Sequence, residues 1–273
     1  MTPDLRDDPT ALAEAADANL VVHAGWAHRR TPGMRVLDDA ALVLVDSGMP
    51  CDTFNLVCRA RLTDDTAPAR VRDAVAYFAT VGRPFSWWVG PADQPAGLGA
   101  LLEGAGLVRA EGEVAMAADL GSLRPGEPTP RGLAVRRVRT HSELADFARV
   151  NAANWAPPDV DVLVFYDRAA PALLADDSPL RFYVGYVDGH PVATAELAEG
   201  GGVVGLYNVA TLEGYRRRGF GSALTLRALL DALARGHRAA VLQAAADGVG
   251  VYARVGFRPF GEVVEYKPPP ANR

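Results

Sequence analysis

Arginine and glycine residues are concentrated between positions 206 and 226, in the stretch LYNVATLEGYRRRGFGSALTL. The pattern predicts a strand that runs into a basic loop, and a helix that begins directly after the loop. The first backbone N–H groups of a helix have no partner inside it, and the helix dipole favours an anion there. Gly219 and Gly221 have no Cβ atom, so a pyrophosphate can come close to the main chain. Arg216, Arg217 and Arg218 can add charge-assisted hydrogen bonds.

Two common phosphate-binding motifs do not fit this loop, and a solvated charge run beside an ordinary turn is the alternative interpretation. A Walker A loop needs Gly-Lys-Ser/Thr, which is absent, and a Rossmann fingerprint needs a third glycine where Leu224 stands. The remaining pattern is Arg216-x-x-Gly219-x-Gly221, preceded by VAT at 209–211 and followed by YARVGF at 252–257. With these flanking motifs, the segment from about residue 132 to residue 267 resembles the GNAT superfamily of N-acyltransferases. The predicted order of elements is also similar to that fold.

The resemblance implies an acyl-CoA site. Backbone amides from Arg217 to Ser222 would bind the CoA pyrophosphate, with Arg216 at the first position of the family motif. Val209, Ala210 and Thr211 would end a strand that splays from its neighbour and pairs with the pantetheine arm, and one of its N–H groups would polarise the thioester oxygen. The implied cofactor-binding set is Val209, Ala210, Thr211, Arg216, Arg217, Arg218, Gly219, Phe220, Gly221 and Ser222.

Tyr252 is the best candidate for a catalytic side chain. In the family a tyrosine of this motif gives a proton to the CoA thiolate, and a phenol with a reference pKa of about 10 stays protonated at neutral pH. The alternative is an aromatic ring that packs on the helix beside Phe257.

The residue that deprotonates the amine is not identified by the pattern. The family often places a glutamate early on the strand before the loop, where this chain has Gly205. We expect Glu196 on the neighbouring strand to be the base, with a solvent-facing strand residue as an equal alternative. Further candidates are Tyr207, Asn208, Asp159 and Asp161. Ala245 is a second departure, because relatives carry a polar residue there that contacts CoA.

The elements that position these residues follow a break at 121–132, GSLRPGEPTPRG, which predicts a linker. After it we expect strands at 133–138, 203–210, 239–243 and 261–266, and a hairpin turning at Asp188-Gly189. We expect helices that begin near Ser142, at 168–175, at 220–233 and at 249–255. This predicts an α/β fold of α+β type with a mixed sheet, built as two GNAT-like domains in tandem at residues 1–125 and 132–273.

The first half ends in a similar way. A periodic helix leads to the strand FSWWVG, a short helix and another strand, and LLEGAGL aligns with VYARVGF so that Gly106 lies over Gly256. We interpret this as a faint internal duplication, although helix-glycine-strand connectors are common in α/β proteins. Leu102 stands at the position of Tyr252, and no Arg-x-x-Gly-x-Gly string precedes FSWWVG. We therefore expect a degenerate first half and one active site per chain.

Composition excludes several other classes. The chain has 273 residues, a formal net charge of -5 and two cysteines, Cys51 and Cys58, which match no zinc spacing. The five histidines, His23 and His28 included, are expected in surface or packing roles. The acidic N-terminal stretch and the lack of a long apolar segment predict a cytoplasmic protein that binds neither membrane nor nucleic acid. We expect no metal, and a monomer or a homodimer.

The resemblance thus implies an acetyl-CoA-dependent N-acyltransferase that transfers the acetyl group directly, in a ternary complex, to a primary amine of a small molecule. We expect the acceptor between the segment from Trp155 to Tyr166 and the groove facing the first half. The alternatives are a CoA-binding sensor or scaffold with little turnover, and an acetyltransferase acting on a protein or peptide amine.

Overall fold

The computed structural model describes residues 8–123 and 129–269, so part of the predicted linker at 121–132 lies outside the described residues. The first half contains α1 (Pro9–Gly25), β1 (Arg35–Asp38), β2 (Val43–Asp46), η1 (Asp52–Phe54), β3 (Leu56–Cys58), α2 (Ala67–Val81), β4 (Ser86–Val89), α3 (Leu98–Gly104), β5 (Val108–Asp119) and η2 (Leu120–Ser122). The second half contains β6 (Leu133–Arg137), α4 (His141–Ala152), α5 (Val160–Leu173), β7 (Leu180–Val187), β8 (His190–Gly200), β9 (Val203–Thr211), η3 (Glu213–Tyr215), α6 (Phe220–Ala234), β10 (Ala239–Ala244), α7 (Val249–Val255) and β11 (Arg258–Lys267).

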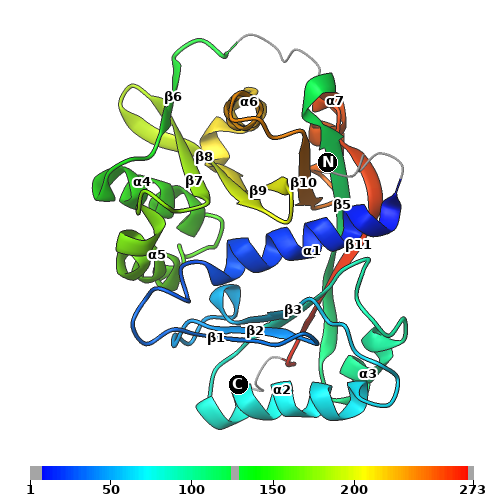
Figure 1. Ribbon diagram of the computed structural model, residues 1–273. Helices are drawn as coiled ribbons and strands as arrows, with labels where there is room; N and C mark the ends of the chain where they lie inside the picture. Colours follow the sequence, from blue (N-terminus) through cyan, green and yellow to red (C-terminus); the bar gives the residue numbers. More distant parts are fainter. Residues whose placement is uncertain (1–7, 124–128, 270–273) are drawn as a thin grey trace.

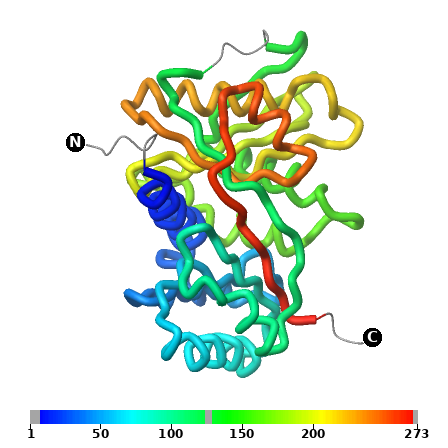
Figure 2. Tube along the Cα trace, turned by 90° about the vertical axis from the view of Figure 1, so that its right-hand side faces the viewer, coloured from blue at the N-terminus to red at the C-terminus, as the bar shows by residue number. Residues whose placement is uncertain are grey.

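One mixed sheet of 11 strands joins the two halves, in the order β1-β2-β3-β4-β11-β5-β10-β9-β8-β7-β6. The last strand of each half lies in the other half: β5 pairs with β10, and β11 pairs with β4. Figure 2 shows β5 and β11 side by side, crossing between the halves, where they form a long antiparallel pair. The predicted mixed α/β fold is confirmed. The division into domains at 1–125 and 132–273 stays a prediction, and the last strand of each half completes the sheet of the other.

Helices cover both faces of the sheet in the second half (Figure 1). One core contains α6, α7 and side chains such as Leu206 and Leu242, and the opposite core contains α4, α5 and Tyr207. Helix α1 lies between the halves: Leu12 and Ala16 pack against Val203 and Val241, and its C-terminal part packs against β2 and β3. Helix α1 therefore belongs to the first half by sequence and contacts the sheet of the second.

Local chemistry explains three of the element boundaries in the second half. Asp188 and Gly189 have φ of 51° and 80°, which gives the predicted tight hairpin between β7 and β8. Helix α4 begins slightly earlier than predicted, because Thr140, not Ser142, is the N-cap, and Glu143 completes a capping box with it. The helix predicted at 168–175 instead spans Val160–Leu173. Its β-branched start and internal Pro171 weaken the helical pattern, and the Asp159 side chain, which accepts from the N–H of Asp161, sets the true beginning.

The order of elements repeats between the halves. The series β1-β2-β3-α2-β4-α3-β5 matches β7-β8-β9-α6-β10-α7-β11, and β3 runs parallel to β4 as β9 does to β10. The ends of α3 and α7 also correspond, since Leu107 N–H donates to the Leu102 carbonyl and Phe257 N–H to the Tyr252 carbonyl, each at 3.1 Å. This is consistent with duplication, which stays a prediction. Among the described residues, no helix is long and apolar enough to span a membrane.

Candidate active site

Strands β9 and β10 separate soon after they begin, and the predicted site lies at this split. They pair only at Ala240 with Val204 and Val241 with Gly205, whereas β10 pairs with β5 along its whole length. The register of β8 against β9 shifts between Thr194 and Glu196, so that Asn208 and Val209 on β9 lie opposite one residue of β8. Asn208 has a φ of 50°. A bulge of this kind bends a strand. Residues 207–211 therefore have a strand partner on the β8 side only, within the described part of the chain.

A polar network holds the bulge on the α4 and α5 face. The Thr194 hydroxyl donates to the Asn208 carbonyl at 2.9 Å, and Asn151 Nδ2 lies 3.2 Å from Thr194 Oγ1. The Asn208 amide donates to Glu196 Oε2 at 2.7 Å and lies 3.2 Å from the Tyr166 hydroxyl. Asparagine tolerates positive φ better than most residues, so the bulge is fixed by local conformation and by its contacts.

The basic loop leads directly into α6. Arg217 and Gly219 have φ of 60° and 79°, and Gly219 is the N-cap, with no side chain capping the helix among the described residues. The first helical bond runs from Ala223 N–H to the Gly219 carbonyl at 3.0 Å. A Cβ atom at Gly221 would lie 3.7 Å from Thr211 Oγ1. The structure therefore brings the helix start and the end of β9 together, as the motif predicts.

The arginines of the loop differ in their contacts. Arg216 Nε donates to the Thr211 carbonyl at 3.1 Å, so this side chain ties the loop to the end of β9. Arg218 lies over the ring of Tyr215, with 5.2 Å between its Cζ and the ring centroid. Arg216, Arg217, Arg218 and Gly219 are exposed, and Phe220 is buried and anchors the start of α6.

Tyr252 lies on α7, at the end of the split bounded by β10. It packs against the core beneath α6, and its ring centroid is 6.0 Å from that of Phe257. Burial, with smaller contributions from Glu113 and Asp247, raises the pKa of Tyr252 to about 12. Burial, aided by Glu111 and Glu265, also raises the pKa of Glu113 to about 7. Glu113 comes from β5 of the first half, and no sequence pattern indicated that it would lie here.

Glu196 is buried, with 2% of the residue exposed, so the solvent-facing interpretation is wrong. Its Oε1 atom lies 2.8 Å from Nδ1 of His23 on α1, and its Oε2 accepts from Asn208. The His23 ring stacks on Tyr207 at 3.8 Å between centroids. Sequence reasoning assigned His23 only a surface or packing role, whereas the structure places it against the candidate base.

Helix α1 also explains the missing glutamate at position 205. A Cβ atom at Gly205 would overlap the Asn19 side chain and the Tyr207 ring. Asn19 is fully buried, and its Nδ2 donates to the carbonyls of Ala198 and Gly200 at 2.9 and 3.0 Å. Tyr207 donates to Asn19 Oδ1 at 2.8 Å. The space that a glutamate would need is therefore occupied by Asn19 of α1 and by the Tyr207 ring.

The remaining candidate bases lie elsewhere. Asp159 caps α5, and its Oδ2 is 3.9 Å from the Cys51 sulfur. Cys51, Asp159 and Asp161 form a group whose possible ligand atoms lie within 4.8 Å of one another. Burial raises the pKa of the Cys51 thiol. Clusters of acidic side chains commonly occur in proteins without binding a metal ion. The expectation of no metal stays a prediction.

The first half has a corresponding split between β3 and β4, but its own chain fills it. The two strands pair only at Leu56 with Ser86 and Val57 with Trp87, and Arg59 has φ of 55°. Beyond this point the backbone of Gln94 pairs with the continuation of β3: Gln94 N–H donates to the Ala60 carbonyl at 3.0 Å, and Leu62 N–H to the Gln94 carbonyl at 3.2 Å.

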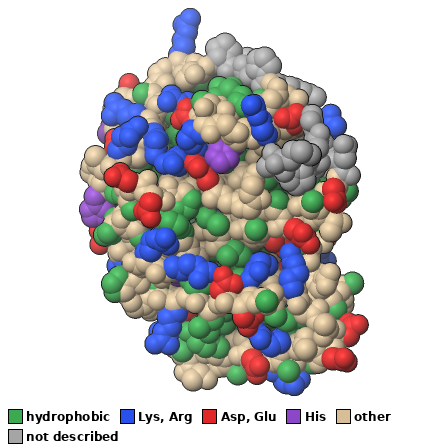
Figure 3. All heavy atoms as spheres, in the orientation of Figure 1, with side chains coloured by type: hydrophobic (Ala, Val, Ile, Leu, Met, Phe, Trp, Pro, Cys, Tyr) green, Lys and Arg blue, Asp and Glu red, His purple; other side chains and the backbone are tan. Residues whose placement is uncertain are grey.

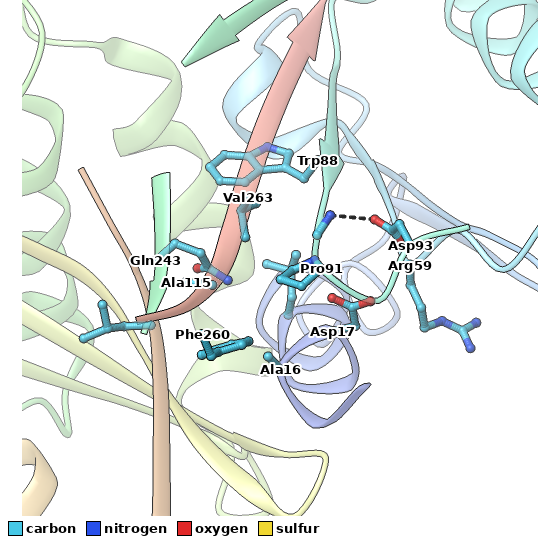
Figure 4. A pocket seen from close by; sticks show the side chains of 13 residues that line it. Ala16, Asp17, Arg59, Trp88, Pro91, Asp93, Ala115, Gln243, Phe260 and Val263 are labelled. Atoms are coloured by element: carbon cyan, nitrogen blue, oxygen red, sulfur yellow. Dashed lines mark hydrogen bonds between the residues drawn. The ribbon is translucent and has the colours of Figure 1, made fainter. Parts of the chain in front are cut away.

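A small cavity lies beside this filled split, between α1 and the sheet (Figure 4). Asp17 and Asp93 face it. Arg61 bridges the two carboxylates at 2.9 and 3.1 Å. Burial, with Asp17 nearby, raises the pKa of Asp93 to about 7. Trp88, Phe260 and Gln243 complete much of the lining, so the cavity reaches β10 of the second half.

Comparison with known families finds a match in the second half. Residues 141–257, which contain the bulged strand, the loop and Tyr252, match the model of the Acetyltransferase (GNAT) family. This stretch, which is less than half of the chain, is similar to GNAT acetyltransferases. Among proteins of curated function, none matches this chain.

Solved structures extend the likeness to nearly the whole chain. A GCN5-related N-acetyltransferase from Kribbella flavida has a TM-score of 0.69 and 22% identity, covering 92% of this chain and 95% of its own. One from Sphaerobacter thermophilus has a TM-score of 0.62 and 19% identity, covering 95% and 92%. A tandem GNAT protein from the clavulanic acid biosynthesis pathway has a TM-score of 0.57 and 16% identity, covering 97% of both chains. At these identities the likeness shows a shared fold along nearly the whole chain.

Proposed function

We propose that the protein transfers an acetyl group from acetyl-CoA directly to a primary amine of a small molecule, in a ternary complex at the β9–β10 split. The observation that carries this proposal is the opening of β9 from β10 beside the start of α6, which no side chain caps within the described residues. The unpaired edge of 209–211 would bind the pantetheine arm, and amides from Arg217 to Ser222 would bind the pyrophosphate. Both ends of one extended ligand would thus be bound by main-chain groups.

Charge stabilisation would come from the backbone near the bulge. When an amine attacks the thioester, negative charge develops on the carbonyl oxygen, and one well-placed N–H donor contributes roughly 3 kcal/mol. An N–H group of 209–211 is available for this role because that edge of β9 has no described strand partner.

Tyr252 would act on the departing sulfur. A pKa near 12 keeps the phenol protonated throughout the neutral range. A thiol has an ordinary pKa of about 8.5, so the phenol alone would not yield its proton fully to the thiolate. Tyr252 would instead donate a hydrogen bond to the sulfur as the C–S bond lengthens, and relay a proton that comes from the amine.

We propose one acyl-CoA site per chain, with the first half a degenerate GNAT-like domain. The pairing of Gln94 with 60–62 occupies the edge that pantetheine would use there. Asp64 and Asp65 precede α2, where a pyrophosphate would meet like charge, and Pro68 removes one amide from the first turn. The equivalent of Tyr252 is the buried Leu102.

A small acceptor fits better than a lysine-rich peptide. On the face seen in Figure 3, acidic and basic side chains are interspersed, so this face offers no continuous acidic surface for a basic segment. Helix α1 and the first half cover the side of the split that carries Glu196. One structural neighbour, a region of a fungal multi-domain protein with a TM-score of 0.59 and 13% identity, is described as a glucosamine N-acetyltransferase. This makes an amino sugar a reasonable first probe.

The test is release of free CoA, measured with a thiol reagent, from acetyl-CoA and a panel of glucosamine, ethylamine, benzylamine and lysine. We expect acetyl transfer to at least one amine, with the acetylated product confirmed by mass spectrometry. A CoA-binding sensor or scaffold is the second candidate, favoured by Gly205 in place of the family glutamate. It predicts that acetyl-CoA binds and that no amine in the panel is acetylated.

A further inference from the structure

We propose that His23, supplied by helix α1 of the first half, is the general base that deprotonates the acceptor amine, and that Glu196 is the residue that positions it. This inference rests on the proposed function and assigns the step that the sequence left open. The reacting group would then come from one half of the chain and the acyl-CoA site from the other.

Glu196 is poorly placed to be the base itself. Only 3% of its side chain is exposed, and both carboxylate oxygens are engaged, Oε1 with His23 at 2.8 Å and Oε2 with the Asn208 amide at 2.7 Å. An ammonium substrate would have to displace one of these bonds inside the protein. A buried carboxylate with two neutral or cationic donors is instead suited to hold an imidazole in one tautomer and to stabilise the imidazolium.

His23, unlike Glu196, has a free acceptor atom, the ring nitrogen Nε2. Because Nδ1 lies on the carboxylate, it carries the hydrogen in the neutral ring, and Nε2 carries the lone pair. Within the described residues Nε2 has no hydrogen-bond partner, and 23% of the His23 side chain is exposed. The ring is stacked on Tyr207 with an interplanar angle of 4°, so its direction is fixed.

The position of the dyad follows from the bulge. Tyr207, which holds the His23 ring, and Asn208, which holds Glu196, directly precede the 209–211 edge where the thioester would lie. Helix α1 is held there by three carbonyls that accept from Asn19, those of Ala198, Gly200 and Val203. The imidazole is therefore presented to the split by a rigid element and not by a loop.

Of the other titratable groups near the ring, the phenols, the thiol and the second histidine are neutral, and Asp17 is paired with Arg61 at 2.9 Å. Burial raises the pKa of Tyr207 on β9, and burial together with Glu196 raises that of Tyr166 on α5, so both phenols keep their protons. Burial lowers the pKa of His28, on the same helix as His23, to about 4. Cys58 on β3 and Asp17 on α1 act on Tyr207, and burial raises the pKa of each. Glu196 is thus the carboxylate in contact with the ring.

Protons and electrons balance in the proposed step. Nε2 of His23 takes one proton from the ammonium and releases it to solvent, which leaves a neutral amine. The nitrogen lone pair attacks the thioester carbon, a C–N bond forms, and the carbonyl electrons move to the oxygen. When the oxyanion collapses the C–S bond breaks, and the second amine proton reaches the sulfur through the Tyr252 hydroxyl. The sum is amide, CoA thiol and one proton released.

The experiment measures acetyl transfer by the full chain to whichever amine of the panel the wild type acetylates fastest, between about pH 6 and 9. We expect His23→Gln to lower kcat by about 100-fold or more, as loss of a general base does, with the Kd for acetyl-CoA unchanged within about twofold. Added imidazole should restore part of the rate of His23→Ala. Glu196→Gln should keep part of the activity, with a lower kcat and an unchanged KM for the amine, because the imidazole is then no longer held in one tautomer.

His190→Gln, on an exposed end of β8, is the matched control and should behave as the wild type. If His23→Gln keeps more than about a third of the wild-type rate across this range, or if imidazole gives no recovery to a folded His23→Ala, the assignment of His23 is wrong while the proposed function stands. If the wild type binds acetyl-CoA but acetylates no amine, both the function and this inference are overturned. Thermal unfolding of each variant shows whether a lost rate reflects a lost fold.

Discussion

His23 Nδ1 and Glu196 Oε1 lie 2.8 Å apart, although 173 residues separate them in the chain. One residue belongs to α1 of the first half, and the other to β8 of the second half. The contact is possible because the halves share one sheet and because α1 packs on the strands of the second half. The two halves are therefore linked at the candidate site itself.

Tyr252→Phe should separate catalysis from binding. The substitution removes only a hydroxyl, so the packing of the ring against Phe257 remains. We expect kcat to fall by about 100-fold. This is at the lower end of the range for loss of a general acid, because a thiolate is already a good leaving group. The Kd for acetyl-CoA, measured by calorimetry, should stay the same. Equal kcat values for variant and wild type would show that Tyr252 is a packing residue.

Gly221→Leu should weaken acetyl-CoA binding without unfolding the protein. A Cβ atom at this position makes ordinary contacts, 3.7 Å to Thr211 and 3.9 Å to Val209, but a longer side chain would enter the space between α6 and the end of β9. We expect the Kd to rise more than about tenfold, or about 1.4 kcal/mol of binding free energy. Gly214→Ala, at an exposed glycine with open space around it, should bind like the wild type.

Gly205→Glu, which restores the carboxylate typical of the family, should not improve the enzyme. Its Cβ would overlap Asn19 and Tyr207, so α1 would have to move away from β9. Overpacking of this kind costs about 1–3 kcal/mol, and here it also breaks the hydrogen bond from Tyr207 to Asn19. Chemical denaturation should show the lower free energy of unfolding. A variant as stable as the wild type would contradict the fixed position of α1.

Glu113 should make stability depend on pH. Its pKa is raised from 4.5 to about 7 in the folded protein, so the folded state binds a proton that the unfolded state has lost. The free energy of unfolding should therefore fall as pH rises through this interval. At pH 8, Glu113→Gln should be more stable than the wild type by on the order of 1–2 kcal/mol, after allowance for partial exposure.

Urea unfolding at about pH 5 and pH 8 measures this difference. The exposed Glu103→Gln on α3 is the control and should show the pH dependence of the wild type. If the Glu113 variant keeps the full pH dependence of the wild type, the buried Glu113 carboxyl is not the cause of the fall in the free energy of unfolding with pH.

Local patterns predicted most of the second half, and long-range contacts account for what they missed. The Asp188-Gly189 turn, the loop at 216–221 and the helix Val249–Val255 each depend on a few adjacent residues, and the structure has them as predicted. Helix α5 was misplaced because its apolar, β-branched first turn does not have a clear helical period. The exchange of β5 and β11 depends on pairing between halves, which leaves no local mark in the sequence.

The candidate site also contains residues that the sequence predicted and residues that only the fold revealed. The basic loop at 216–221 and Tyr252 could be found because their spacing is short and characteristic. His23 and Glu113 could not, since each is brought to the site by the first half, and nothing in the neighbouring residues of either distinguishes it from a surface residue. The substitution of glycine for glutamate at position 205 was visible, but its cause, the buried Asn19, required the fold.

Calorimetric titration of the full chain with acetyl-CoA tests the central claim most directly. The account predicts saturable binding with one acetyl-CoA per chain, because the edge of β9 at 209–211 is open and the equivalent edge in the first half is paired with Gln94. Absence of binding at millimolar acetyl-CoA would contradict the whole account, and two sites per chain would contradict the assignment of a degenerate first half.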